Sequence, residues 1–290
     1  MSATRRCDLH MHTVHSDGTL TPTQLVELAK KQGLSCIALT DHDTLSGVEE
    51  AQAAGSRLGV EVIAGVEISV ICESGTMHIL GYFIDPKSKQ LQENLEEIQE
   101  ARRQRNPMII EKLRKLGLDI TLAEVEGESG GDQVGRPHFA RVLVAKGYVK
   151  NFEEAFEKYL TKGAPGYVDK RKLTSRDAIE MIEEAGGIAS LAHPKLVKKD
   201  AKPGEIDQML GKLKSEGLKG LEVYSSCQNK EEAALFKKAA EKLGLFITGG
   251  SDFHGANKPD VILGGMGEGA SIPYETIDEM KKLLLDRKVK

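Results

Sequence analysis

The fold is decided by residues 7–43, which read CDLHMHTVHSDGTLTPTQLVELAKKQGLSCIALTDHD. Two short apolar runs, CDLHMHT and CIALTDHD, flank an amphipathic stretch, TPTQLVELAKKQG. In that stretch Thr21 suits a helix N-cap, Pro22 the first helical position and Gly33 the C-terminal stop. The segment therefore predicts a strand, a helix and a second strand, with histidines at the end of each strand.

The same alternation continues along the chain. Further apolar runs are EVIAGVEIS, TMHILGYF, GIASLAHP, LKGLEVYS and LFITGGSDFHG, and most are separated by helical patterns that end in glycine. Strand and helix in turn predict a largely parallel sheet. Because there are seven strand candidates, we expect an α/β fold in the form of a distorted (β/α)7 barrel rather than an open sheet.

Residues 91–162 break this rhythm, because they show helical patterns and no clear strand. Pro107 interrupts the first of these patterns and predicts a break or kink there. We expect a small inserted helical subdomain at residues 91–162, on a barrel domain made of residues 1–90 and 163–290. The alternative is that the segment is only a long crossover of the barrel.

The composition limits the classes of function. The chain has 290 residues, 40% of them hydrophobic, and a formal net charge of −4, which gives no global attraction to duplex DNA or to an anionic membrane. The four cysteines form no CxxC pair, and no apolar run approaches the ~18 residues of a membrane span. The start of the sequence has no apolar segment typical of a secretory signal. We expect a cytoplasmic protein with no obligate protein partner.

The placement of the eight histidines carries the strongest functional signal. Six of them lie in or just after a strand candidate, beside an acid or a turn residue. The carboxyl ends of the strands form the active-site face of a βα barrel. Side chains two apart on a strand share a face, so Asp8, His10 and His12 point the same way and present two imidazoles to one metal ion.

Several acids accompany these histidines. Glu67 lies in an otherwise apolar run, where a carboxylate is costly unless it is paired or binds a metal ion. An aspartate beside His42, in TDHD, is placed to orient that imidazole. The candidate ligands are His10, His12, Asp17, His42, Glu67, His78, His193, Asp252 and His254.

Each of these residues alone is also compatible with a satisfied core histidine or an N-cap aspartate. Together they predict one shared metal site at the barrel mouth. Nine ligands exceed the need of one ion, so two or three divalent ions are implied. Nitrogen and oxygen ligands without a thiolate suit manganese, zinc or iron, and manganese is our preferred assignment.

These motifs also resemble a known family. DLHMHTVHSDG, TDHDT, GVEIS, HILGY, AHP and GSDFH are similar to the signature runs of the PHP (polymerase and histidinol phosphatase) family. The helical region with RPH resembles the branch that acts on nucleotide 3',5'-bisphosphates and on the 5' ends of short RNA. The resemblance implies a distorted seven-stranded βα barrel with a trinuclear metal centre.

The resemblance also implies a ligand set for each ion. The first ion would be held by His10, His12, Glu67 and Asp252, the second by Glu67, His78 and His193, and the third by Asp17, His42 and His254. Some family members have a histidine one residue after Asp17, but that position here is Gly18. His15 matches no ligand position and is expected at the rim of the site.

Substrate contacts are implied by the same resemblance. Arg136, His138 and Lys162 would reach over the barrel mouth and grip phosphate, a role that suits the planar guanidinium fork. Clustered metal ions supply hydroxide at neutral pH for attack on phosphorus. The chain has no GxSxG nucleophile motif and no P-loop. We therefore expect a metal-dependent phosphoesterase acting on small nucleotides or short RNA ends.

Three other functions stay open at this stage. A histidinol-phosphate-type phosphatase would use the same metal chemistry on another phosphoester. A C–N hydrolase on a similar barrel would often bridge its metals with a carbamylated lysine, a place that Glu67 takes here. A non-catalytic metal-binding regulatory module would be favoured by a missing ligand, yet the predicted ligand set is complete. The chain has no room for the domains of a polymerase.

Overall fold

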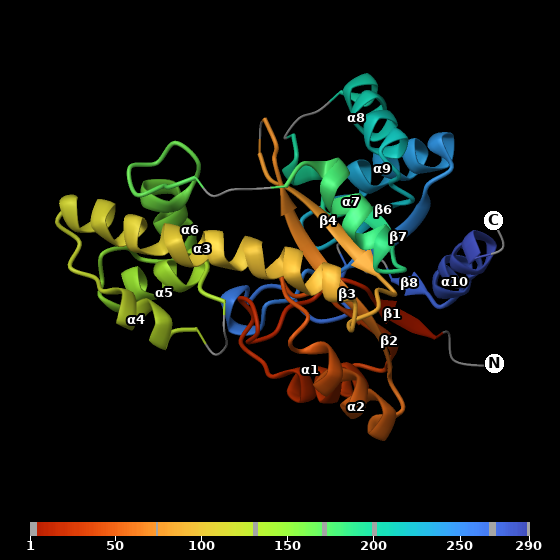
Figure 1. The fold of residues 1–290 in the computed structure, drawn as a ribbon, viewed down its shortest axis with the longest axis horizontal. Coiled ribbons are helices and arrows are strands. Elements are labelled where there is room, and N and C mark those ends of the chain that lie inside the picture. Colours follow the sequence, from red (N-terminus) through yellow and green to blue (C-terminus); the bar gives the residue numbers. More distant parts are fainter. Residues whose placement is uncertain are drawn as a thin grey trace.

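A computed structural model of the chain describes residues 5–73, 75–129, 133–169, 173–198, 202–266 and 271–288. Within these ranges, eight strands form one sheet in the order β7-β6-β5-β4-β3-β2-β1-β8 (Figure 1). The strands are β1 Arg6–Asp8, β2 Leu34–Leu39, β3 Glu61–Val70, β4 Met77–Tyr82, β5 Ile188–Leu191, β6 Gly220–Ser225, β7 Phe246–Gly250 and β8 Ile272–Pro273.

The sheet curls into a nearly closed barrel. Beyond the end of β1, the Leu9 N–H donates to the Gly249 carbonyl at 3.2 Å, and Met11 forms a parallel bridge with Phe253. These contacts join the chain after β1 to β7 and the residues after it, at the other end of the strand order. The distorted α/β barrel predicted from the sequence is therefore confirmed. Its seven expected strands are joined by β8, a short addition that pairs antiparallel with Arg6 and Cys7 of β1.

The strands are not all parallel. β1, β2 and β3 run parallel to one another, as do β5, β6 and β7, but β4 is antiparallel to both β3 and β5. The cause is the connection between β3 and β4, which spans only residues 71–76 and is too short for a parallel crossover. As a consequence, β4 begins at the end of the barrel where its neighbours finish.

Helices follow the strands and cover the barrel. They are α1 Pro22–Lys31, α2 Val48–Leu58, α7 Ser175–Glu184, α8 Pro203–Ser215, α9 Lys230–Leu243 and α10 Glu275–Lys288, with the 3-10 turns η2 Pro194–Leu196 and η3 Gly255–Asn257. The Thr21 hydroxyl caps α1 by accepting from the Gln24 N–H, as the sequence predicts. α10 packs on the barrel through buried Ile277 and Met280.

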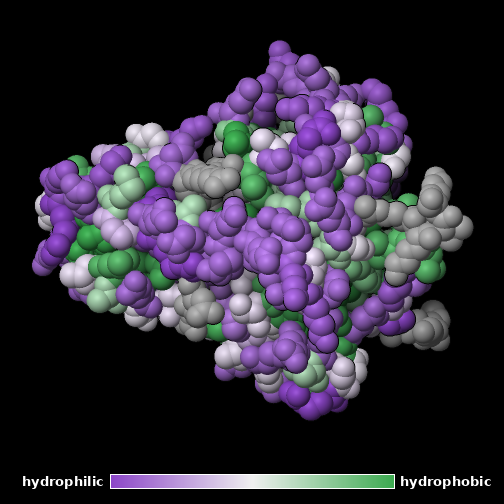
Figure 2. Space-filling view, viewed as in Figure 1, coloured by the Kyte–Doolittle hydropathy of each residue, from purple (hydrophilic) through white to green (hydrophobic). Residues whose placement is uncertain are grey.

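Between β4 and α7 the described chain is helical. These helices are α3 Lys89–Lys115, α4 Leu122–Gly127, α5 Arg136–Ala145, α6 Phe152–Ala155 and the π-helix η1 Phe156–Leu160. The sequence predicts a break or a kink at Pro107. α3 runs through this residue without a break, so the helix tolerates the lost hydrogen bond. Figure 2 shows hydrophilic side chains over the outer face of α3.

α3 belongs to two hydrophobic cores. Its first half contributes Leu91 and Leu95 to the barrel core, whereas Ile109 and Leu113 belong to a separate cluster. That second cluster is completed by Phe139 and other apolar residues of α4, α5 and η1. In Figure 1 these helices project to one side of the barrel. The division into two domains, with its boundaries at residues 91 and 162, stays a prediction.

None of the helices in the described ranges is both long enough and apolar enough to cross a membrane.

Candidate metal centre

The predicted ligands gather at one end of the barrel. They come from the residues that follow β1, β2, β5 and β7, from the interior of β3 and from the start of β4. The reversed direction of β4 explains why His78 takes part, since it pairs with Ser69 near the end of β3. Six strands that are widely separated along the chain thus deliver side chains to a single place.

Glu67 lies at the centre of this cluster of candidate ligands, and its side chain is 1% exposed. Its Oε2 lies 3.0 Å from Nδ1 of His42, 3.1 Å from Nε2 of His12 and 3.2 Å from Nε2 of His10. Its Oε1 lies 2.6 Å from Nδ1 of His78 and 2.9 Å from Nε2 of His193. One carboxylate therefore meets five imidazoles.

Several of these buried atoms fit metal coordination better than hydrogen bonding. Glu67 Oε2, Nε2 of His10 and His12, and Nδ1 of His42 make no hydrogen bond within the described structure. Buried polar atoms without partners cost free energy. Two ligand atoms that each lie ~2.1 Å from one ion, at right angles to each other, are ~3 Å apart. The spacing around Glu67 therefore suits divalent ions, and the cluster is capable of binding metal.

Three groups of ligand atoms lie close enough to share ions. They are His10, His12, Glu67 and Asp252; His12, Asp17, His42 and His254; and His42, Glu67 and His78. The first group coincides with the predicted first set. The second adds His12 to the predicted third set, and the third contains His42 in the place expected for His193. His193 still contacts Glu67, so all nine predicted ligands lie at this centre.

The electrostatics favour ionised carboxylates in the cluster. Burial opposes ionisation of Asp17, but His254 and His42 hold its pKa well below the usual range. Burial lowers the pKa of His42 to about 3, so this imidazole is neutral at pH 7. Burial acts in the same direction on His12, yet the carboxylates of Asp252 and Glu67, 3.3 and 3.1 Å from its Nε2, raise its pKa to about 9. A metal ion that binds His12 must therefore displace a proton.

A second layer of carboxylates fixes the ligands in place. Glu222 of β6 is fully buried, with Oε1 2.9 Å from Nδ1 of His10, and its Oε2 accepts from the His193 N–H at 2.6 Å. Such contacts set the tautomer and orientation of a ligand histidine. The sequence reading missed Glu222, although GLEVYS places a carboxylate in an apolar run just as GVEIS does.

The aspartates on either side of His42 contact other parts of the structure. Asp41 accepts from the Thr13 hydroxyl and from the Ser16 hydroxyl, both at 2.6 Å. It therefore fixes the turn that carries Asp17. Asp43 pairs instead with Arg102 of α3.

The backbone around the centre is unusual. Asp43, His193 and Asp252 have positive φ values of 54°, 26° and 55°, a region that residues other than glycine rarely occupy. Gly250 lies so near the site that a Cβ there would be 2.2 Å from the Cβ of His10. The lack of a side chain at Gly250 therefore lets the backbone approach His10 closely.

A cavity of about 590 Å³ opens above the centre. Asp17, His42, His78 and His254 line one part of it. Cations line another part, namely Arg102, Arg105, Arg136 and Lys258. The cavity therefore combines ligand side chains and guanidinium groups, an arrangement that suits an anionic molecule.

The structure supports only one of the three predicted substrate residues by its position. Arg136 lines the cavity, where its Nη1 donates to the Leu160 carbonyl at 3.0 Å and its guanidinium lies 5.5 Å from the centre of the Tyr167 ring. His138 is buried away from the cavity, with Nδ1 accepting from the Gly135 N–H at 2.8 Å, so it fixes the start of α5. Lys162 is exposed and does not line the cavity.

Three cations of the cavity were missed by the sequence reading. Arg102 and Arg105 lie in the charged pattern of α3, which looks like a solvated helix face. Arg105 is nevertheless buried, and burial lowers its pKa to about 9. Lys258 lies 2.5 Å from Oδ2 of Asp252. The approach of α3 and of the residue after η3 to the barrel mouth distinguishes these three cations from ordinary surface charges.

A barrel that gathers histidines and carboxylates beneath a cationic cavity defines a metal-dependent hydrolase. A sequence model of the PHP domain matches residues 8–188, and the chain belongs to this family of metal-dependent phosphoesterases. The chain is 37% identical over 255 residues to the 3',5'-nucleoside bisphosphate phosphatase of Chromobacterium violaceum, covering 85% of this chain and 86% of that one. It is 36% identical over 249 residues to the 5'-3' exoribonuclease Rnm of Escherichia coli, covering 85% and 84%.

Solved structures share the fold. A Chromobacterium violaceum protein described as an amidohydrolase, with sulfate and no metal bound, superposes with a TM-score of 0.87 at 34% identity, over 96% of both chains. A protein from Bifidobacterium adolescentis, described as a candidate metal-dependent phosphoesterase, gives 0.84 at 31% identity, again over 96% of both chains.

Proposed function

We propose that the protein hydrolyses phosphate esters of small nucleotides, namely nucleoside 3',5'-bisphosphates and the 5' ends of short RNA. The observation that carries this proposal is the cavity that has candidate metal ligands on one part of its wall and arginines on another. Two separate anion sites suit a substrate with two phosphate groups. The names of the Chromobacterium and Escherichia relatives favour the same substrates.

Nine candidate ligands, Glu67 and eight residues around it, support a centre of two or three divalent ions, with manganese preferred and zinc or iron as alternatives. Such ions supply hydroxide for attack on phosphorus and neutralise the phosphate oxygens. Residues of the chain would hold the substrate, with Arg136 and Arg105 binding the second phosphate. Glu222 and Asp41 keep the ligand side chains and the Asp17 turn in position.

The test is a comparison of substrates with the manganese-loaded protein. Adenosine 3',5'-bisphosphate, histidinol phosphate and an aryl phosphate would be assayed for phosphate release. We expect the bisphosphate to have the highest kcat/KM. Release only from the other two substrates would remove the nucleotide assignment, and no release from any, with metal content verified, would favour a binding module.

A variant sharpens this test. Arg136→Ala should lower kcat/KM on the bisphosphate by about 100-fold, because it removes a partly buried charged contact to the second phosphate, and should change aryl phosphate hydrolysis little. Arg114→Ala is the control, since this arginine lies on exposed α3 surface near Asp119. Equal losses on both substrates would contradict the grip by Arg136.

A further inference from the structure

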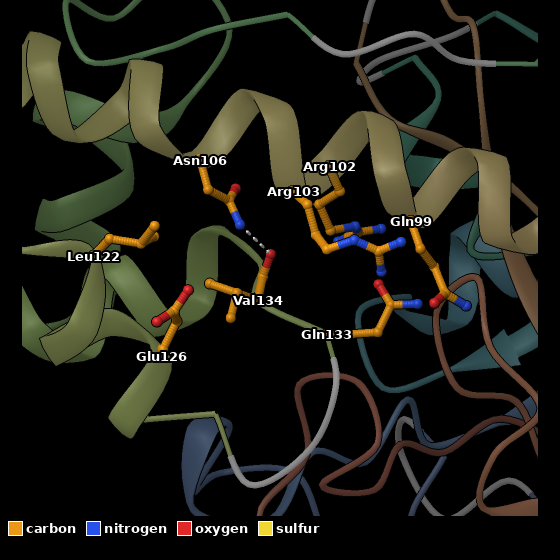
Figure 3. A pocket seen from close by; sticks show the side chains of 8 residues that line it. All are labelled: Gln99, Arg102, Arg103, Asn106, Leu122, Glu126, Gln133 and Val134. Carbon is orange, nitrogen blue, oxygen red and sulfur yellow. Dashed lines mark hydrogen bonds between the residues drawn. The ribbon is translucent and has the colours of Figure 1, made fainter.

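A second cavity lies beside the first, in the helical region. It has a volume of about 390 Å³ and is lined by residues of α3, α4 and residues 133–134. In Figure 3, Gln99, Arg102 and Arg103 extend from α3 toward Gln133. Leu122 and Glu126 belong to α4. The volume falls at the small end of the range for ligand sites, so it suits one ring system rather than an extended chain.

The wall of this cavity holds buried polar groups that lack partners. Gln133 is 3% exposed, and its Nε2 donates to the Asp43 carbonyl at 3.1 Å, while its Oε1 accepts from no described residue. The buried Nε of Arg102 likewise donates to no described residue. An unused acceptor and an unused donor on one wall match the edge of a nucleobase, which presents both kinds of group.

A second amide in the wall, that of Asn106, already has hydrogen-bond partners. Asn106 donates from Nδ2 to the Val134 carbonyl at 3.0 Å, and its Oδ1 accepts from Arg105 at 3.0 Å. These bonds make the wall rigid. The side chains of Leu122 and Val134 add apolar surface against which a flat ring can lie.

This second cavity adjoins the cavity above the metal centre, and the two share one wall residue. Arg102 lines both cavities, and it pairs with Asp43, the residue that follows the candidate ligand His42. A ligand whose first nucleotide occupies the cavity above the metals therefore has an adjacent compartment beyond Arg102. A mononucleotide is too short to use it, whereas an RNA of two or more nucleotides can.

We infer that this cavity binds the base of the second nucleotide of a short RNA whose 5'-terminal nucleotide lies at the metal centre. The inference rests on the proposed function and deepens it, because it separates RNA from free bisphosphates by a binding contact. The amide and guanidinium groups would contact the edge of the base, and Leu122 would contact its face.

The test fills the cavity. Leu122→Trp should lower kcat/KM for a 5'-phosphorylated dinucleotide by about 10-fold or more, the equivalent of losing one base contact, and leave adenosine 3',5'-bisphosphate within about 2-fold. Ala123→Trp is the matched control, since Ala123 is the next residue of α4, is exposed and does not line the cavity. Equal effects of both variants on both substrates would overturn the inference.

A second measurement needs no variant. The wild-type protein would be assayed on the same dinucleotide lacking its second base, for which we expect a comparable loss of about 10-fold in kcat/KM. Unchanged turnover of that substrate would refute base binding even if Leu122→Trp failed to fold. If the wild type turned over neither bisphosphate nor dinucleotide, the proposed function itself would fail, and this outcome is distinct from the failure of the second cavity.

Discussion

Single buried carboxylates set the geometry of the metal centre. Glu67 contacts five imidazoles, and Glu222 holds His10 and the backbone of His193 from behind. Both acids lie in strands that are otherwise apolar, where a carboxylate persists only when other groups compensate its charge. The histidines near Glu67 and the backbone N–H near Glu222 supply that compensation, so the acids and the ligands depend on one another.

Glu222→Gln tests this dependence. The amide keeps the size of the side chain but loses the charge that holds the His10 imidazole, so manganese affinity should fall by about 10- to 100-fold. The measurement is a titration of metal-free protein with Mn²⁺. Glu241→Gln, on the exposed face of α9, serves as control and should bind as the wild type does. Wild-type affinity in both variants would show that Glu222 does not position the ligands.

At the scale of elements, α3 connects the helical region to the barrel. Gln99 and Gln133 both donate to the Asp43 carbonyl, at 2.9 and 3.1 Å, and Arg102 pairs with its carboxylate. Asp43 in turn accepts from the Ser69 N–H of β3 at 3.2 Å. The positive φ of Asp43 is thus held by contacts from both sides, and the turn that carries His42 is fixed by helix and strand together.

Arg102→Ala should therefore destabilise the fold. Asp43 is fully buried, and removal of its guanidinium partner should cost about 3 kcal/mol of unfolding free energy or more. Urea unfolding measures this cost. Arg103→Ala is the control, because its ion pairs with Glu96 and Glu100 are exposed and worth at most about 1 kcal/mol.

Asp43→Asn added to Arg102→Ala should restore part of the lost stability, since it removes the unpaired charge. If the Arg102→Ala and Arg103→Ala variants had the same free energy of unfolding, the contact of Arg102 with Asp43 would not stabilise the fold.

At the scale of the whole molecule, the sequence predicts what local pattern controls. Strand–helix alternation indicated the barrel, and six histidines and three acids in or near the strands indicated nine residues that the structure brings together. The antiparallel direction of β4 depends on the length of its connection to β3. The short β8 and the continuity of α3 through Pro107 depend on tertiary packing. No local sequence pattern predicts these features. The sequence pattern suggests surface charges at Arg102, Arg105 and Lys258. Their position in the cavity wall depends on how α3 and η3 pack against the barrel.

Six strands contribute to the metal centre, so metal ions should act as cross-links of the entire barrel. Ions bind the folded arrangement and not the separated ligands of the unfolded chain. Each bound ion should therefore raise the free energy of unfolding by about 2.7 kcal/mol at a free ion concentration of about 100 Kd. We expect the midpoint of urea unfolding to rise when Mn²⁺ is added to chelated protein. Asp252→Asn removes a carboxylate shared with His10 and His12, so its midpoint should respond much less. Addition of Na⁺ at equal ionic strength controls for screening. If the wild type unfolded at the same midpoint with and without Mn²⁺, the gathered side chains would not form a shared metal centre, and the phosphoesterase chemistry proposed for them would lack its basis.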